Sequence, residues 1–252
     1  MRGLEVLTAV LDSAEPVPLA AVARQTGMNR ATVYRMLTTL AEAGYLTISP
    51  GQPVYSPGPQ TLRYLRGSQL ENALRDRLLP LVNRLGELSQ ETVSLLMPAW
   101  PDYVCIAVCL SPHPVRRHRS LGDLTDMTNS ATGRAYLAYA PDEVEPLLAA
   151  RPLRPLASGG TYTRADLAEL LAGVRRRGYA TAESETSAGM NGLVAPLFRP
   201  DSARPVAVIS VSGPDSRWNA AAMREFAPTL LAGIAGAGFG PAAPAAAEQE
   251  SA

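Results

Sequence analysis

Residues 18–44 constrain the fold more than any other part of this 252-residue chain, because two short amphipathic patterns meet there at one glycine. A first helix is expected to begin at Pro18, whose fixed φ suits the first turn, and to end at Gly27. Asn29 is the expected N-cap of a second helix. The positions that the first helix would bury are Leu19, Val22 and Ala23. Two short helices joined by a glycine turn are typical of a helix-turn-helix.

The second helix of this pair has one apolar face and one short polar face. When Val33 points inward, Leu37 falls on the same side at helical spacing, whereas Arg35 falls on the opposite side. A helix can enter the major groove of DNA when its leading outward residues are slim and some of them donate hydrogen bonds to phosphate or guanine. The segment therefore predicts a DNA-reading helix. Its candidate DNA-contact residues are Arg24, Asn29, Arg30, Ala31, Thr32, Tyr34 and Arg35.

The residues around this pair complete a compact unit over 1–58. Apolar spacing at 4–11 predicts a helix before the pair, and 45–49 and 54–56 alternate like two strands around a turn at 50–53. A strand hairpin directly after a recognition helix indicates a winged helix-turn-helix domain. For the helix pair alone, an ordinary helical hairpin with a solvated face is the open alternative.

The charge of residues 1–58 is the one compositional observation against DNA binding, because neutralised phosphates supply most of the sequence-independent affinity. The arginines and the acids of this unit balance, so it is formally neutral. Arg24, Arg30 and Arg35 nevertheless gather around the turn between the two helices. We therefore expect binding to depend on base contacts and on a second copy of the chain more than on bulk charge.

Residues 59–90 carry leucine and valine at intervals of three to five. This spacing predicts one long linker helix, or two helices joined near Gly67 and Ser68. A linker that packs on its own domain is the open alternative.

Beyond residue 90, strand-like runs alternate with helical ones, which predicts an α+β domain over 91–235. The tail at 236–252 is rich in Ala, Pro and Gly and is predicted to be disordered. The expected strands are 92–97, 103–110, 193–197 and 206–212, and the expected helices are 134–139, 164–177 and 220–234.

Several short motifs follow one another along the chain: Asn29-Arg-Ala-Thr-Val-Tyr-Arg-Met-Leu, Glu42-Ala-Gly-Tyr-Leu, Ala131-Thr-Gly-Arg-Ala, Val194-Ala-Pro-Leu and Ile209-Ser-Val-Ser-Gly-Pro. In order and spacing they resemble the IclR family of bacterial transcription regulators over nearly the whole length. The resemblance implies a GAF-like effector-binding domain at 91–235, dimer contact through 59–90, and a homodimer or homotetramer on a double-stranded DNA operator. It implies a small organic acid or aromatic metabolite as the effector.

Three places in the predicted α+β domain suit a small ligand. Small residues at 128–131 precede a helix that starts near Thr132, whose free backbone N–H groups would attract an anion. Ser210 and Ser212 share one face of a predicted strand, and a glycine-rich loop at 189–193 enters the opposite strand. An ordinary helix cap and hydroxyls satisfied by nearby backbone are the alternatives. By resemblance, the effector-contact residues are Ser130, Ala131, Thr132, Gly192, Ser210 and Ser212.

The sequence indicates no enzyme, no metal site and no cofactor. No C-x-x-C pair occurs, and two histidines are too few for a zinc site. Cys105 and Cys109 are expected on one face of a strand as buried apolar side chains. A GAF-type cysteine redox enzyme is the competing class, although no basic neighbour in the sequence would activate either thiol. We interpret Arg116, Arg117 and Arg119 as a solvated loop that could also pair with an acidic ligand or partner.

No apolar run in the chain is long enough to span a bilayer, and the N-terminal residues lack an apolar signal segment. We therefore expect a cytoplasmic protein with no membrane partner. The predicted function is a ligand-responsive regulator that reads a pseudo-palindromic operator. The alternative is a DNA-binding regulator with a vestigial pocket, controlled by its oligomeric state alone.

Overall fold

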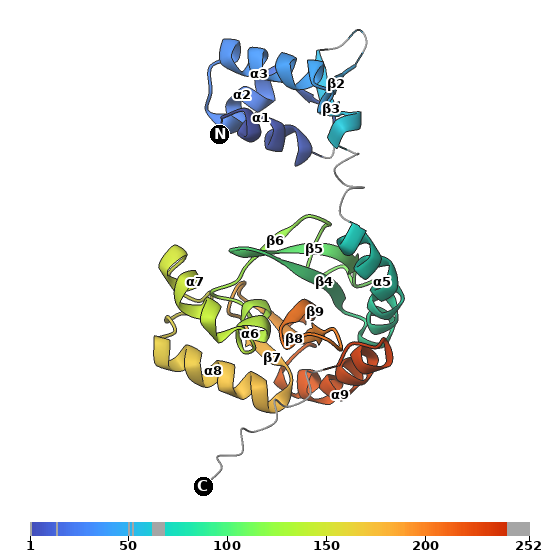
Figure 1. Cartoon of the computed structure of the whole chain (residues 1–252), viewed down its shortest axis with the longest axis vertical. Helices are drawn as coiled ribbons and strands as arrows, with labels where there is room; N and C mark the ends of the chain where they lie inside the picture. Colours follow the sequence, from blue (N-terminus) through green and yellow to red (C-terminus); the bar gives the residue numbers. More distant parts are fainter. Residues whose placement is uncertain (1, 14, 50, 52, 62–68, 241–252) are drawn as a thin grey trace. The chain divides into compact units, whose positions relative to one another are not determined.

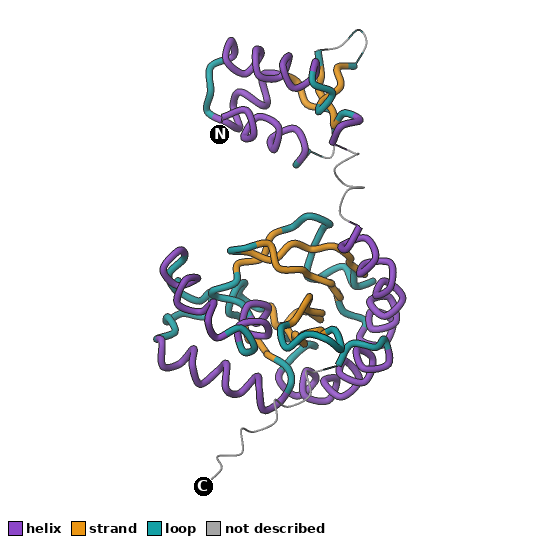
Figure 2. The backbone as a smooth tube through the Cα atoms, viewed as in Figure 1, coloured by secondary structure: helices purple, strands orange, loops and turns teal. Residues whose placement is uncertain are grey.

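The computed structural model describes residues 2–13, 15–49, 51, 53–61 and 69–240 (Figure 1). The chain divides into two compact units, Met1–Asn72 and Ala73–Ala252. Helices dominate the first unit, whereas the second combines a large sheet with helices (Figure 2).

The first unit is a helix-turn-helix with a small antiparallel sheet. Its elements are α1 (Arg2–Leu11), β1 (Val17–Pro18), α2 (Leu19–Thr26), α3 (Arg30–Glu42), β2 (Leu46–Ile48) and β3 (Val54–Pro57). Gly27 forms the turn between α2 and α3 with a φ of 67°, in the left-handed region that favours glycine. Strands β2 and β3 form the wing hairpin. The apolar core of this unit contains Val6, Val10, Val22, Val33, Leu37, Leu46 and Tyr55.

The start of α2 differs from the prediction by one residue. Pro18 has extended backbone, with a φ of −75° and a ψ of 153°, and it is the N-cap of α2. It also belongs to β1, where it pairs with Val54 of the wing. The expectation that the helix begins at Pro18 was wrong, because this segment adds an edge strand to the wing. Pro50 and Gln52 of the predicted turn lie outside the described residues.

The second unit is built on a six-stranded antiparallel sheet with strand order β6-β5-β4-β9-β8-β7. The strands are β4 (Thr92–Ala99), β5 (Asp102–Cys109), β6 (Leu124–Asp126), β7 (Ala180–Glu183), β8 (Met190–Phe198) and β9 (Pro205–Pro214). The helices are α5 (Gln69–Ser89), α6 (Ala131–Leu137), η1 (Pro141–Glu143), α7 (Val144–Ala150), α8 (Arg164–Arg177) and α9 (Ala220–Gly236). The second unit is therefore the α+β domain that the sequence predicts.

Helices cover both faces of this sheet (Figure 1). Helices α5 and α9 pack on one face, where Leu95, Ile209 and Leu230 are fully buried. Helices α6, α7 and α8 pack on the other face, where Leu96 and Val208 are fully buried. Because neighbouring residues of a strand point to opposite faces, β4 and β9 supply side chains to both cores.

The predicted elements overlap the observed ones, and α8 coincides with its prediction at Arg164–Arg177. Its ends carry strong local signals, since Thr163 and Asp166 form a capping box and Gly178 follows with a φ of 80°. The edge strands β6 and β7 and the helix α7 were not predicted. The strands are three and four residues long, which is too short for an alternating pattern to stand out.

The apolar stripe of α5 packs within the chain. Leu74, Leu78, Val82 and Leu85 are between 0% and 8% exposed and lie in the core shared with α9. This packing of α5 corresponds to the alternative of a linker that packs on its own domain. In the described part of α5, the large apolar side chains that remain exposed are Leu79 and Leu88. The predicted joint near Gly67 and Ser68 lies outside the described residues.

The predicted disordered tail begins too early. Phe239 is 3% exposed and belongs to the core of the second unit, and the guanidinium carbon of Arg77 lies 4.7 Å from its ring centroid. Arg77 also donates to the Ala237 carbonyl at 3.0 Å. The prediction was wrong for these residues because one aromatic side chain holds them against α5. Residues 241–252 lie outside the described residues.

Candidate functional site

The predicted DNA-contact residues lie on the first turns of α3, at its N-cap and, for Arg24, at the end of α2. The Asn29 side chain accepts a hydrogen bond from the Thr32 N–H at 2.8 Å, so Asn29 caps the helix as predicted. Tyr34 is 55% exposed, and Thr32 is half-buried. The other exposed members of the set are Arg24, Asn29, Arg30, Ala31 and Arg35. Together these residues, at the end of α2 and over the first two turns of α3, form the candidate DNA-contact surface.

Three arginines, Arg24, Arg30 and Arg35, belong to this surface. Among the residues that the structure describes, no acid pairs with Arg24, Arg30 or Arg35. Their guanidinium groups are therefore available for phosphate or base edges, although the unit as a whole is neutral. Asn29 uses its carbonyl oxygen as the cap, which leaves its amide N–H groups as donors.

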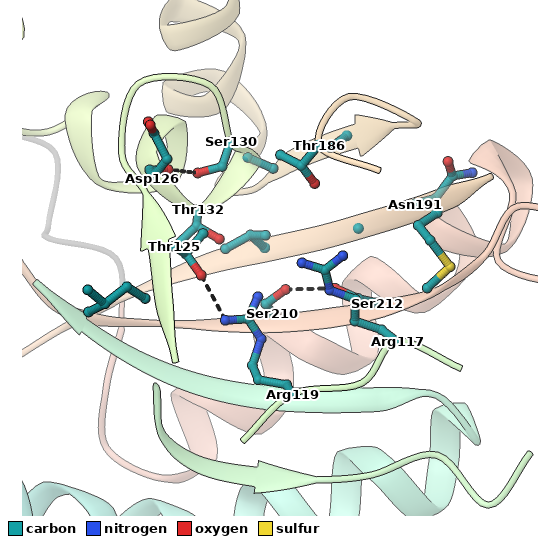
Figure 3. Close-up of a pocket in the computed structure, with 16 residues that line it drawn as sticks. Arg117, Arg119, Thr125, Asp126, Ser130, Thr132, Thr186, Asn191, Ser210 and Ser212 are labelled. Carbon is teal, nitrogen blue, oxygen red and sulfur yellow. Dashed lines mark hydrogen bonds between the residues drawn. The ribbon is translucent and has the colours of Figure 1, made fainter. Parts of the chain in front are cut away.

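The second unit contains a pocket of about 190 Å³ on the sheet face that carries α6 (Figure 3). Strands β8 and β9 form its floor, and the first residues of α6 and the strand β6 form its walls. All six residues predicted for effector contact line it, namely Ser130, Ala131, Thr132, Gly192, Ser210 and Ser212. The fold thus gathers into one cavity residues that are 82 positions apart at the extremes.

All three serines of this set already have hydrogen-bond partners. Ser130 is the N-cap of α6, and its hydroxyl accepts from the Gly133 N–H at 3.0 Å and donates to the Asp126 carbonyl. The hydroxyls of Ser210 and Ser212 lie 3.0 Å apart and share a hydrogen bond. Because a hydroxyl has one donor and two acceptor positions, this pair keeps hydrogen-bonding capacity for a ligand.

Glycine at two positions shapes the pocket. A Cβ on Gly133 would lie 1.6 Å from the Met127 carbonyl oxygen, so only glycine lets α6 approach the segment before it. A Cβ on Gly192 would lie 3.5 Å from the Ser212 hydroxyl, which is ordinary contact. A side chain at Gly192 would therefore fit the backbone and occupy pocket space, and glycine leaves that space open.

The sequence placed the arginines of the pocket in a solvated loop and gave pairing with an acidic ligand only as an alternative. Arg119 is only 9% exposed and lines the pocket with the half-buried Arg117, whereas Arg116 is exposed. The interpretation of a solvated loop was therefore wrong for Arg119 and in part for Arg117. The loop folds back on the sheet because the Thr92 hydroxyl donates to the Arg117 carbonyl at 2.7 Å. No local pattern in the sequence signals this long-range contact.

Further polar residues of the pocket were also missed. The residues that line it beside the predicted set and the two arginines include Thr125, Asp126, Thr186 and Asn191. Asp126 lies within ion-pair distance of Arg151 and Arg154, at 3.6 and 3.5 Å. Burial raises the pKa of Asp126, but hydrogen bonds from Thr128 and Asn129 and the charge of Arg151 outweigh it and hold the pKa below its usual range. Asp126 is therefore a charged residue whose charge is already balanced.

A buried ion pair ties α6 to the loop after β7. The side chain of Arg134 is 2% exposed, and its guanidinium group donates to both carboxylate oxygens of Glu185, at 2.7 and 2.9 Å. Arg134 also donates to the Thr181 carbonyl at 2.6 Å, and the Tyr162 hydroxyl donates to Glu185 at 3.0 Å. Glu185 thus anchors the loop after β7, and that loop supplies Thr186 to the pocket.

The two cysteines lie on opposite faces of the sheet, so the prediction that they share one face was wrong. A bulge between Leu95 and Leu96 of β4 places Ala107 opposite Leu95 but Cys105 opposite Leu96, and this shift reverses the side-chain direction. Burial raises the pKa of the Cys105 thiol to about 11 and also raises the pKa of Cys109. Thiols with raised pKa values are poor nucleophiles, which argues against the redox enzyme.

The described residues also bear on a metal site and on a membrane span. No group of three or more His, Cys, Asp or Glu side chains there is arranged to hold a metal ion. None of the helices in the described ranges is long and apolar enough to cross a membrane.

Comparisons with known proteins assign both parts of the chain to one family. The family model for the C-terminal domain of bacterial IclR transcriptional regulators matches residues 69–234, and that for the IclR helix-turn-helix domain matches residues 1–49. The transcriptional repressor IclR of Escherichia coli is 29% identical over 238 residues, which are 91% of this chain and 85% of the relative. Other similar proteins are likewise named as transcriptional regulators, in agreement with the expectation of a non-enzyme.

Solved structures show the same fold. The Thermotoga maritima IclR structure has a TM-score of 0.72 at 23% identity and covers 94% of this chain and 96% of its own. An IclR homologue from Microbacterium hydrocarbonoxydans in complex with 4-hydroxybenzoate has a TM-score of 0.73 at 22% identity and covers 93% of this chain and 98% of its own. With two family models matching and the helix-turn-helix and α+β units in the order of those structures, this chain belongs to the IclR family of bacterial transcription regulators.

Proposed function

We propose that this regulator binds a pseudo-palindromic DNA operator as a homodimer or a dimer of dimers, and that a small organic acid or aromatic metabolite in its pocket changes this binding. The observation that carries the proposal is the presence in one chain of an unpaired basic helix face and a separate polar pocket. Proteins of similar sequence are named as repressors, and a protein of the same fold binds 4-hydroxybenzoate. The regulator acts where the DNA is, in the cytoplasm.

The DNA-contact set divides by its chemistry. Arg35 and Tyr34 lie on the outward face of α3 and reach base edges when the helix enters the major groove, whereas Arg24 on α2 contacts phosphate. Two copies place their recognition helices about 34 Å apart, which matches one turn of DNA. A neutral first unit gives weak non-specific attraction, so the second copy is needed for useful affinity.

The ligand acts by favouring one arrangement of the dimer over another. Ser210 and Ser212 offer hydroxyls and the first turn of α6 offers backbone N–H groups around the pocket. A ligand shifts an equilibrium between arrangements only when it binds one of them more tightly. The change in separation between the two DNA-reading helices then alters operator affinity.

Fluorescence anisotropy at one fixed salt concentration tests the proposal. The full chain is titrated with DNA from upstream of its own and neighbouring genes and with a scrambled duplex of equal length. We expect a preference for one of the upstream fragments, a dimeric or tetrameric mass by analytical ultracentrifugation, and a change in affinity on adding a small acid. Equal binding to the upstream and scrambled DNA would contradict the proposed function.

A further inference from the structure

Among the residues that the structure describes, two arginines of the pocket have no acid within ion-pair distance. They are Arg119 and Arg117, which both line the pocket. Burial lowers the pKa of Arg119 and the nearby charge of Arg117 lowers it further, and the opposing effects of Cys105 and Asp123 do not offset them. A buried charge without a partner costs free energy, so this arrangement favours an incoming anion.

The acids nearest to these arginines are already occupied. Asp126 lies between Arg151 and Arg154 and accepts hydrogen bonds from Thr128. Asp123 is exposed and accepts from the Ser120 N–H at 2.7 Å. Neither of them is within ion-pair distance of Arg117 or Arg119, so the positive charge inside the pocket is left for a ligand.

The two guanidinium groups are held by different parts of the pocket wall. Arg119 donates to the Thr125 hydroxyl on β6 at 2.7 Å, and Arg117 donates to the Ser187 hydroxyl after β7 at 2.8 Å. Figure 3 shows both groups extending toward the Ser210 and Ser212 pair. Each arginine has five N–H donors and uses one of them in the hydrogen bond to the Thr125 or Ser187 hydroxyl. Each guanidinium group can therefore still bind a carboxylate through two parallel N–H donors.

We propose that the pocket takes a small aliphatic dicarboxylate, with one carboxylate held by Arg119 and the other by Arg117. The inference rests on the proposed function in assuming that this pocket is the effector site, and it names the class of effector. A single carboxylate would leave one of the two cations unbalanced. The volume of about 190 Å³ is below the range of roughly 300–1,000 Å³ that is usual for drug-sized ligands, which suits a chain of a few carbons.

Isothermal titration calorimetry on the full chain tests the dicarboxylate. The probes are malonate, succinate, glutarate and adipate, with butyrate as the one-carboxylate analogue of succinate. We expect the best dicarboxylate to bind about 10- to 100-fold more tightly than butyrate, because one charge-assisted interaction is lost. Arg117→Gln and Arg119→Gln should each remove this advantage. Arg116→Gln is the matched control, since Arg116 lies on the same loop but is exposed and does not line the pocket.

Each result decides the inference. Equal binding of butyrate and the dicarboxylates, or unchanged dicarboxylate binding in both glutamine variants, would overturn it. The comparison of butyrate with the dicarboxylates uses only the wild-type chain, so it tests the proposal even if a variant misfolds. If none of the four dicarboxylates binds at millimolar concentration while operator preference is intact, the dicarboxylate is wrong and the proposed function stands. If operator preference is absent, the proposed function fails, and calorimetry still decides the ligand class.

Discussion

Arginine is used in opposite ways in the two units of this regulator. In the first unit Arg24, Arg30 and Arg35 stand exposed on a helical surface, whereas in the second unit Arg119 is 9% and Arg134 is 1% exposed. An exposed arginine gains little from the protein itself and is free to meet a large charged partner such as DNA. The charge of a buried arginine must be balanced by an acid of the fold, as Glu185 balances Arg134, or by an anionic ligand, as we propose for Arg119.

The largest effect is expected where an internal charge loses its partner. Arg134→Met leaves the Glu185 carboxylate buried without its cation, which should lower the free energy of unfolding by about 3–5 kcal/mol. Arg164→Met is the control, because the Arg164–Glu145 pair is 66% and 68% exposed, and its loss should cost less than about 1 kcal/mol. Urea unfolding followed by tryptophan fluorescence reports on the second unit, since both tryptophans of the chain, Trp100 and Trp218, lie there.

A double variant sharpens this test. Arg134→Met combined with Glu185→Leu removes both charges and should recover much of the stability that the single change loses. A double variant as unstable as Arg134→Met alone would show that packing, and not the unpaired carboxylate, causes the loss.

The next effect concerns the exposed arginines and separates base contacts from phosphate contacts. Arg35→Ala should weaken binding to the preferred DNA by about 10- to 100-fold, with a much smaller effect on scrambled DNA, because a base contact is lost. Arg24→Ala should weaken both by a similar factor and reduce the salt dependence. Anisotropy titrations on both duplexes at several salt concentrations measure this. Equal losses on the two duplexes for Arg35→Ala would mean that Arg35 contacts only phosphate.

The two units also differ in how far their sequence predicts their structure. In the first unit the signals are local: Gly27 makes the turn, Asn29 caps the helix, and the spacing of Val33 and Leu37 sets the buried face. The candidate DNA surface follows directly from that helical spacing. In the second unit α8 was predicted for the same reason, through its capping box and the glycine after it.

The missed features of the second unit all depend on contacts between distant residues. Arg119 is buried because its loop folds back over the sheet, and Cys105 changes face because of a bulge against β4. Phe239 orders the start of the tail because it packs with Arg77. The positions of the effector candidates were predicted from motifs of the family, whereas the two arginines beside them carry no motif and required the fold.

The space beside Gly192 gives a smaller effect on the pocket side. Gly192→Val places a branched side chain next to the Ser212 hydroxyl and should weaken dicarboxylate binding about tenfold by steric exclusion. Thermal unfolding should change little, since the added Cβ meets only ordinary contacts at 3.5 Å. Unchanged ligand affinity in a stable variant would place the ligand away from β8.

The smallest effect is a pH dependence that originates in Asp126. Its pKa is lowered in the folded chain, although burial raises it, because hydrogen bonds from Thr128 and Asn129 and the charge of Arg151 prevail. As the pH falls, the unfolded chain therefore binds a proton at Asp126 before the folded chain does. The stabilisation from Asp126 is present above the usual carboxyl pKa, and it is lost as the pH drops through the lowered pKa of the folded chain. Asp126→Asn should cost about 1 kcal/mol at neutral pH and progressively less in acid. Urea unfolding of both proteins between neutral and acidic pH measures the difference. A constant difference across that range would show that Asp126 acts through its shape and hydrogen bonds, and that its charge does not balance the arginines around the pocket.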